Sequence, residues 1–213
     1  MYKRKRYNYR VAGDDDDDDD EWSNEIGKNT KVKCEDNHIY FYDDVNSDSI
    51  LALNQYIRRL NTLLLNTKTD IKHRFSCDVD LCIYLHINSK GGSIFDSLGS
   101  VDTIINSQIP IISIIEGSAA SAATFLSVVC KKRQMTRHSS MLIHQLSSGG
   151  WGTYEQIKDE YSNCTYLQET ITKLYVEYSG GKLKAEKLKK CLKRDIWWDA
   201  TKCLKFGLID EII

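Results

Sequence analysis

A serine, a histidine and an aspartate in three separate segments of this chain are the residue types needed for acyl transfer. Ser121 lies in a run of small residues, His144 comes near the end of an apolar segment, and Asp195 follows further along the chain. A serine hydroxyl is a weak nucleophile until a base removes its proton, and the base works best when a carboxylate fixes its tautomer. Together the three segments indicate a hydrolase.

The segment around Ser121 predicts a turn between a buried strand and a helix. Residues 109–117 are apolar and β-branched and stop at a glycine, which is typical of a strand. Residues 122–130 are apolar on nearly every face, which is typical of a buried helix. A serine between them lies at a helix N-terminus, where free N–H groups favour a developing oxyanion. The alternative is that the small residues only pack a helix tightly against a sheet, since short motifs recur by accident.

A second turn, built from Gly91 and Gly92, lies upstream. Residues 77–87 predict a strand before this turn. The apolar residues that recur at helical spacing after it are Ile94, Leu98, Val101 and Ile105. Because the ends of parallel strands gather at one edge of a sheet, we expect this turn and the Ser121 turn to lie together. A plain turn between a strand and a helix is the alternative.

Four segments, taken in order, resemble the ClpP family, the proteolytic subunit of the caseinolytic (Clp) protease. They are residues 88–92, 117–123, 141–145 and 194–213. The resemblance begins near residue 39, and four ordered motifs are more specific than any one of them. It implies an α/β fold, the ClpP/crotonase-like spiral of βαβ units with a projecting handle helix. It also implies a serine endopeptidase that cleaves unfolded polypeptides inside two stacked heptameric rings, with an ATP-dependent unfoldase as a further partner.

The resemblance implies a role for each candidate site residue. Ser121 would be the nucleophile, His144 the general base and acid, and Asp195 the orienting carboxylate. The backbone N–H groups of Gly92 and Ala122 would form the oxyanion hole. The segment that would pair with an extended substrate, as an added strand, comprises Ser147, Ser148, Gly149 and Gly150.

The chain departs from the family pattern near these residues. Lys90 and Leu146 stand where the family usually has proline, so both turns lose a restraint on φ. Ala122 replaces a common methionine, which keeps the N–H group but removes a side chain from the pocket wall. His86 and Ser107 stand where aromatic or large apolar residues line the pockets that receive an unfoldase. We therefore expect intact chemistry, altered packing and weak unfoldase docking.

Each catalytic candidate also has a plainer interpretation. A lone histidine on an apolar strand is more often a satisfied core residue than a catalytic one. Three aspartates compete for the orienting role, but Asp199 has the spacing of an N-cap on a short helix that ends before Gly207. The alternative functions are a catalytically weak or inactive ClpP-like ring subunit with a scaffold or regulatory role, and a crotonase-like acyl-CoA enzyme. The latter class usually lacks the serine and histidine pair.

The composition favours one folded domain whose positive and negative charges nearly cancel. The 213 residues include 29 Lys and Arg against 30 Asp and Glu, so charge indicates neither a nucleic-acid nor a membrane partner. No apolar segment is long enough to cross a bilayer, and the chain begins without a signal-type apolar region. The seven cysteines show no metal-ligand spacing, so we expect reduced thiols, no metal, no cofactor and a cytoplasmic location.

The first part of the chain differs in kind from the rest. Residues 1–10 carry five basic side chains, and residues 14–20 are an unbroken run of aspartates. Like charges repel, and the segment has little apolar surface to offset the entropy of ordering. We therefore expect a disordered charged tail over residues 1–33 and a ClpP-like protease domain over residues 34–213. Short strands of that domain are predicted at residues 39–45, 133–136 and 141–145.

Two further helices are predicted from apolar periodicity. One covers residues 47–66, with Ser47 or Asp48 as its cap, and the polar residues 67–75 are expected to form a loop. The other covers residues 153–178 and would be about 40 Å long at 1.5 Å per residue. A helix of that length projects beyond a compact domain, and in the family it is the handle that interlocks two rings. The alternative is a helix folded against its own sheet.

Overall fold

The structure of the protein, a computed structural model, describes residues 26–213, so most of the predicted tail lies outside the described residues. Ile26 is buried, and the Tyr56 hydroxyl donates a hydrogen bond to its carbonyl oxygen at 3.1 Å. Strand β1 (Val32–Glu35) then crosses the boundary predicted at residue 33. The folded domain therefore begins earlier than predicted, because apolar side chains before that boundary are buried.

The strands of the described chain form one twisted sheet in the order β1-β2-β3-β4-β5-β8. Strands β2 to β5 and β8 are parallel along this path, and β1 pairs antiparallel with β2. Strand β4 pairs with β5 along its first part and with β6 along its last part, which turns the sheet into a spiral. The strands after β1 are β2 (His38–Phe41), β3 (Ile83–Ser89), β4 (Ile111–Ala120), β5 (Lys132–Met135), β6 (Ser140–Leu142), β7 (Trp198–Asp199) and β8 (Glu211–Ile212).

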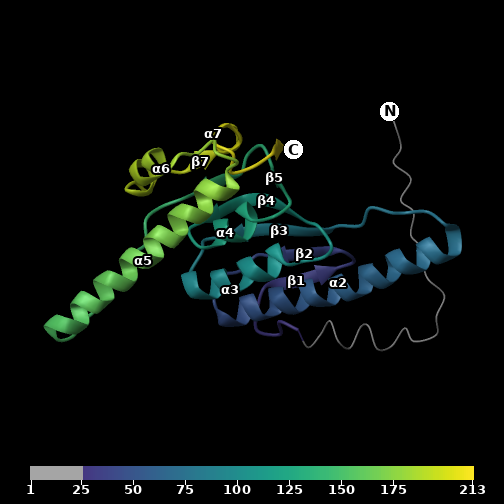
Figure 1. Cartoon of the computed structure of the whole chain (residues 1–213), viewed down its shortest axis with the longest axis horizontal. Helices are drawn as coiled ribbons and strands as arrows, with labels where there is room; N and C mark the ends of the chain where they lie inside the picture. The colour runs from purple at the N-terminus through teal and green to yellow at the C-terminus, as the bar shows by residue number, and fades with distance from the viewer. Residues whose placement is uncertain (1–25) are drawn as a thin grey trace.

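Helices α2, α3 and α4 follow one another along the sheet, with α2 beside β1 and β2 and α4 beside β3 and β4 (Figure 1). The buried apolar core lies between these helices and the strands. The helices of the described chain are α2 (Ser47–Phe75), α3 (Ile94–Ile105), α4 (Ala123–Val128), α5 (Tyr154–Tyr178), α6 (Ala185–Leu192) and α7 (Ala200–Lys205). None of these helices is both long enough and apolar enough to cross a membrane.

The start of α2 differs from the prediction. Asn46, and neither Ser47 nor Asp48, is the N-cap, because its side-chain oxygen accepts hydrogen bonds from the N–H groups of Asp48 and Ser49 at 3.0 Å. The Ser49 hydroxyl in turn accepts from the N–H of Asn46, which completes a capping box. Asparagine is a preferred N-cap residue, and here it lies one residue before the predicted cap.

The end of α2 also differs from the prediction, since residues 67–75 are helical. The hydroxyls of Thr67 and Thr69 each donate to a carbonyl oxygen four residues earlier, at 2.9 Å. The threonine hydroxyls of this segment are therefore satisfied inside the helix, and neither glycine nor proline interrupts it. The helix ends at Ser76, whose φ of 50° is left-handed. The predicted loop is wrong, and the last part of α2 extends past the strands (Figure 1).

The long helix α5 is present as predicted and projects from the body at the end opposite to α2 (Figure 1). Thr153 caps it in a capping box with Gln156. Its buried side chains begin only at Leu167, so the first half of the helix makes no core. The projection confirms the expected handle helix of the fold.

Candidate active site

Ser121 occupies a tight turn between β4 and α4. Its φ is 53°, in the left-handed region that residues with a side chain rarely adopt. Its N–H donates to the carbonyl oxygen of Leu142 at 2.8 Å, and its own carbonyl oxygen accepts from the N–H and the hydroxyl of Thr124 at 3.0 and 2.6 Å. The surrounding hydrogen bonds therefore hold a strained backbone, a feature that clusters at functional sites.

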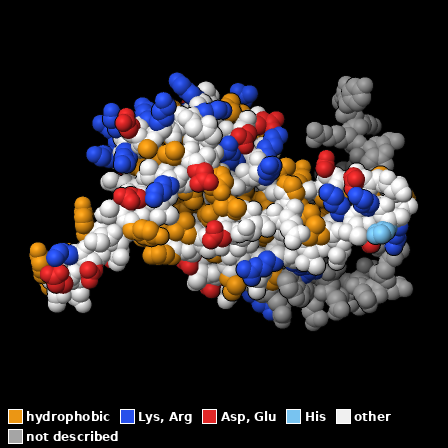
Figure 2. All heavy atoms as spheres, viewed as in Figure 1, with side chains coloured by type: hydrophobic (Ala, Val, Ile, Leu, Met, Phe, Trp, Pro, Cys, Tyr) orange, Lys and Arg blue, Asp and Glu red, His pale blue; other side chains and the backbone are white. Residues whose placement is uncertain are grey.

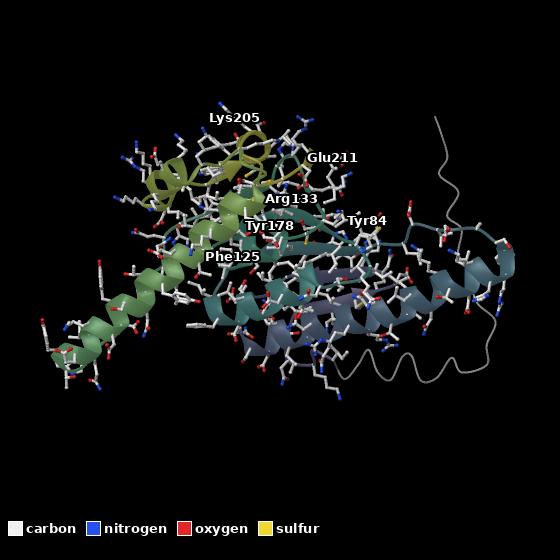
Figure 3. All side chains as sticks on the ribbon, in the orientation of Figure 1. Tyr84, Phe125, Arg133, Tyr178, Lys205 and Glu211 are labelled. Atoms are coloured by element: carbon white, nitrogen blue, oxygen red, sulfur yellow. The ribbon has the colours of Figure 1, made fainter. Side chains whose placement is uncertain are left out.

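Ser121 and His144 line the same small cavity, with a volume of about 60 Å³. Phe125 closes one side of it where α4 meets α5, and its ring lies 5.4 Å from that of Tyr175 (Figure 3). The cavity is lined by Gly92, Ile94, Ser121, Phe125, His144, Gln145, Leu146, Ser147, Ile171 and Tyr175. Segments from four parts of the chain thus meet at the serine.

The turn at Gly91 and Gly92 lies against the turn at Ser121, as predicted. A Cβ atom on Gly91 would lie 2.5 Å from the carbonyl oxygen of Ala120 and 2.7 Å from the Cβ of Ser121. A Cβ atom on Gly92 would lie 2.2 Å from the carbonyl oxygen of Val45. Both glycines also have positive φ, 92° and 150°. Only glycine fits at either position without displacing backbone.

The N–H groups of Gly92 and Ala122 donate no hydrogen bond to any residue that the structure describes. The carbonyl oxygen of Ala122, by contrast, accepts a hydrogen bond from the Ser97 hydroxyl at 2.7 Å. Two unused N–H groups beside one hydroxyl have the donor set that an oxyanion requires. Their assignment as an oxyanion hole stays a prediction.

His144 and Asp195 face each other with Nδ1 and Oδ1 3.6 Å apart. The His144 side chain is 24% exposed, whereas that of Asp195 is 77% exposed. The N–H of Gln145 donates to the carbonyl oxygen of Leu192 at 2.7 Å, which ties the chain after β6 to the end of α6. No hydrogen bond joins Ser121 to His144 within residues 26–213. The three candidates are thus gathered at one edge of the sheet without being fully aligned.

The other two aspartates are engaged elsewhere. Asp199 accepts from the N–H of Lys202 at 2.7 Å and caps α7, as predicted. Asp210 accepts from the guanidinium of Arg133, with Nε 2.9 Å from Oδ2. Burial alone would raise the pKa of Asp210, but the hydrogen bonds and charge of Arg133 outweigh it and lower that pKa. Asp195 is the carboxylate that remains for His144.

The segment predicted to bind substrate as an added strand, residues 147–150, is exposed and has no strand partner in the described chain. Ser147 reaches the cavity, and the Ser148 hydroxyl donates to Glu160 Oε1 at 2.6 Å. Just before it, the N–H of Leu146 donates to Gln168 Oε1 at 2.9 Å. An exposed backbone with both ends tethered can accept a partner strand, and this role stays a prediction.

Sequence reasoning missed Tyr175 of α5. This fully buried side chain lines the cavity, and its hydroxyl is hydrogen-bonded to that of Thr124, behind the serine. Burial raises the pKa of Tyr175 above its ordinary value, so the phenol stays neutral. The pair joins the handle helix to the serine turn. No local pattern marks it, because it depends on two elements far apart in the chain.

The spiral sheet and the helices that cover it define a mixed α/β protein. The Clp protease family model matches residues 39–213, and the chain belongs to this family.

Relatives and solved structures agree with this assignment. The chain is 32% identical over 140 residues to the ATP-dependent Clp protease proteolytic subunit 2 of Synechococcus sp. (strain CC9605), covering 64% of this chain and 69% of that protein. It is 33% identical over 138 residues to the proteolytic subunit 1 of Prochlorococcus marinus subsp. pastoris, with the same coverage. A ClpP1 point mutant from Listeria monocytogenes has a similar fold, with a TM-score of 0.69 at 20% identity over 83% of this chain and 91% of that chain.

Proposed function

We propose that this protein is a serine endopeptidase that cleaves unfolded polypeptides with Ser121, His144 and Asp195. The observation that carries the proposal is that Ser121 and His144, from distant segments, line one cavity, with Asp195 Oδ1 3.6 Å from His144 Nδ1. Membership of the Clp protease family supports it. No metal ion is needed for this chemistry, because the base and the oxyanion donors are all supplied by the chain.

The geometry suggests the following reaction. His144 takes the hydroxyl proton of Ser121 as Oγ of Ser121 bonds to the carbonyl carbon of the substrate. Asp195 accepts a hydrogen bond from Nδ1 of the resulting imidazolium. The carbonyl oxygen becomes an oxyanion between the N–H groups of Gly92 and Ala122. His144 then gives the proton to the leaving amine, and a water molecule, activated in the same way, hydrolyses the acyl-enzyme.

The separation of 3.6 Å between His144 and Asp195 is longer than a strong hydrogen bond. Catalytic hydrogen bonds are often long without substrate and tighten in the reacting complex. A substrate strand that pairs with residues 147–150 would press on the segment that begins at His144. Substrate binding therefore aligns the triad, which ties activity to occupancy of the site.

The proposed working form is an assembly of two stacked heptameric rings, with α5 between the rings. Its first half is exposed in the single chain and carries large apolar side chains. Such a surface is stabilised when another chain covers it. The chambers would admit unfolded chains, and an ATP-dependent unfoldase is the proposed partner that supplies them.

Labelling by a fluorophosphonate, together with the native mass of the assembly, tests both parts of this proposal. Wild-type protein and Ser118→Ala, a variant of a neighbouring serine, should be labelled within a ring-sized complex. Ser121→Ala should assemble and remain unlabelled. Assembly without labelling in the wild type would favour a scaffold subunit. Turnover of acyl-CoA without labelling would favour a crotonase-like enzyme.

A further inference from the structure

A dense group of cations surrounds α6. Residues 182–194 contain seven Lys and Arg and one acid, Glu186, in a chain whose net charge is −1. All seven cationic residues are exposed, and blue side chains gather over this part of the molecule at the upper left of Figure 2. We name this surface the basic ridge, and it comprises Lys182, Lys184, Lys187, Lys189, Lys190, Lys193 and Arg194.

Most of the positive charge of the basic ridge is not neutralised by the rest of the described chain, although the charge of Lys182 helps to lower the pKa of Asp210. Ion pairs elsewhere join Arg133 to Asp210 and Lys132 to Glu211, but no ridge cation takes part in an ion pair within residues 26–213. α6 buries Leu188 and Leu192, which leaves its lysines on the solvent side. Lys187, Lys189 and Lys190 lie on α6 and the other ridge cations flank it. Like charges so close together in sequence repel each other, so the ridge attracts an anionic partner.

The ridge ends at the candidate active site. The carbonyl oxygen of Leu192 accepts the N–H of Gln145 at 2.7 Å, and Gln145 lines the cavity that contains Ser121. Lys193 and Arg194 follow directly, and Asp195 comes next, facing His144. The cationic surface and the site therefore share a stretch of backbone.

We propose that the basic ridge selects substrates with acidic side chains close to the cleaved bond. This inference rests on the proposed peptidase function. A substrate strand at residues 147–150 would leave the cavity next to Gln145, whose N–H is bonded to the carbonyl oxygen of Leu192 at the end of α6. Charges interact over a screening length of about 10 Å at moderate salt. Acidic residues of the substrate gain attraction there, while lysines and arginines are repelled. Main-chain pairing alone has little preference for particular substrate side chains. The ridge thus adds a preference for acidic ones.

Three quenched peptides that share one cleavage site and carry Glu, Gln or Lys on both sides of it test the preference. We expect kcat/KM at low salt to be on the order of tenfold higher for the Glu peptide than for the Lys peptide, because charged clefts speed association by roughly 10 to 1000-fold. In about 0.5 M salt the ratio should approach one, since screening then acts over only a few ångströms.

Two variants with the same change in net charge locate the effect. Lys189→Gln with Lys190→Gln should lower the ratio of Glu to Lys peptide by about threefold, as part of the ridge remains. Arg58→Gln with Arg74→Gln, on exposed positions of α2, should keep the wild-type ratio. An equal loss in both variants would show an effect of net charge alone and overturn the ridge as the cause.

Binding of the same peptides, fluorescently labelled, to Ser121→Ala separates the ridge from catalysis. A preference for the Glu peptide in binding supports the ridge even if the wild type cleaves nothing, an outcome that would refute the peptidase proposal alone. Equal cleavage and equal binding of all three peptides would overturn the ridge and leave the peptidase proposal standing. Tight binding of single-stranded RNA without any peptide preference would also overturn it, in favour of a nucleic-acid surface.

Discussion

Gly91 packs so closely on Ser121 that a Cβ atom added to the glycine would lie 2.7 Å from the Cβ of the serine. This distance is shorter than any ordinary contact between carbon atoms. The turn after β3 therefore packs directly against the turn after β4. A shift of the backbone at Gly91 would displace Ser121 as well.

Gly91→Ala should lower kcat by on the order of 100-fold, because a shift of about 1 Å in a catalytic group has that effect. The methyl group meets backbone and Ser121 itself, and the φ of 92° is also unfavourable for alanine. Peptide cleavage measures the effect. The control is Gly99→Ala within α3, where a Cβ atom meets nothing within 4 Å. Full activity of Gly91→Ala would contradict the packing argument.

Asp195→Asn should lower kcat by at least about 100-fold, since an amide can donate an N–H to His144 and favour the wrong tautomer. The high exposure of Asp195 argues that water replaces part of its effect. Asp199→Asn is the matched control, because asparagine caps a helix as well as aspartate does. Comparable turnover of Asp195→Asn and the wild type would move the orienting role to another carboxylate.

The sequence predicted the elements that carry a local signal. The apolar runs before Gly91 and Ser121 identified β3 and β4, although both strands begin later than predicted. The strand predicted over residues 39–45 likewise ends at Phe41, and the chain then turns toward the cap of α2. Asp199 was predicted as a cap because the N-cap pattern involves only neighbouring residues. The meeting of Ser121 with His144 followed from the family resemblance rather than from any single pattern.

Two of the features that could not be predicted depend on contacts between distant segments, and a third depends on hydrogen bonds within one helix. The hydrogen bond between the hydroxyls of Thr124 and Tyr175 joins α4 to α5, and no sequence pattern near either residue predicts it. The helical end of α2 was missed because polar composition was interpreted as a loop, whereas its threonine hydroxyls bond within the helix. The packing of Ile26 on α2 could not be predicted either, because a single apolar residue in a polar segment shows no periodic pattern of hydrophobicity.

A chain of polar side chains on β2, β3 and β4 should make stability depend on pH. His38 Nδ1 lies 2.8 Å from His86 Nε2, and His86 Nδ1 lies 3.0 Å from Glu116 Oε1. Each bond is satisfied when Nδ1–H of His38 donates to Nε2 of His86 and Nδ1–H of His86 donates to Glu116. A proton added to His38 would be repelled by a charge on His86. Burial and then the charge of His86 lower the pKa of His38, and together they outweigh the opposite effects of Asp36, Glu35 and Glu116.

A histidine whose pKa is lowered on folding stabilises the protein above its ordinary pKa, and this contribution is lost as the pH falls. The melting temperature should therefore decline between about pH 7 and pH 5. The decline should be shallower in His38→Phe, which keeps a ring beside Tyr84 but takes up no proton. His73→Gln, at an exposed position of α2, should keep the wild-type slope in calorimetry. Identical slopes in all three proteins would rule out His38 as the source.

Deletion of residues 1–21 should leave small-peptide cleavage unchanged and shift the melting temperature by less than about 2 °C, because a self-repelling segment makes few stabilising contacts. Deletion of residues 1–31 is the informative comparison. It also removes Ile26, which is buried and accepts a hydrogen bond from Tyr56, so the melting temperature should fall by at least about 4 °C. A large fall with the shorter deletion would show that the acidic run is docked on the domain.

The last prediction concerns the docking of an unfoldase, which in the family inserts apolar loops into aromatic-lined pockets. The family resemblance predicts that Tyr84 and His86, both on β3, occupy two of the lining positions, and Tyr84 keeps the aromatic ring (Figure 3). His86 retains ring stacking, with its centroid 4.6 Å from that of Tyr40, but its nitrogens are bonded to His38 and Glu116. The imidazole therefore adds hydrogen-bonded polar groups at a position where the family resemblance predicts an aromatic side chain.

Replacing one large apolar lining group removes roughly 1.5 to 3 kcal/mol, which is about one to two decades of affinity per site before several sites act together. We therefore expect rapid cleavage of short peptides but poor ATP-dependent degradation of a folded substrate when a generic unfoldase is added. His86→Tyr should raise the degradation rate, while His73→Tyr on α2 should not. Efficient degradation by the unmodified protein would refute the prediction, because a pocket with a polar, carboxylate-bound imidazole would then bind the apolar loops as well as an aromatic one does.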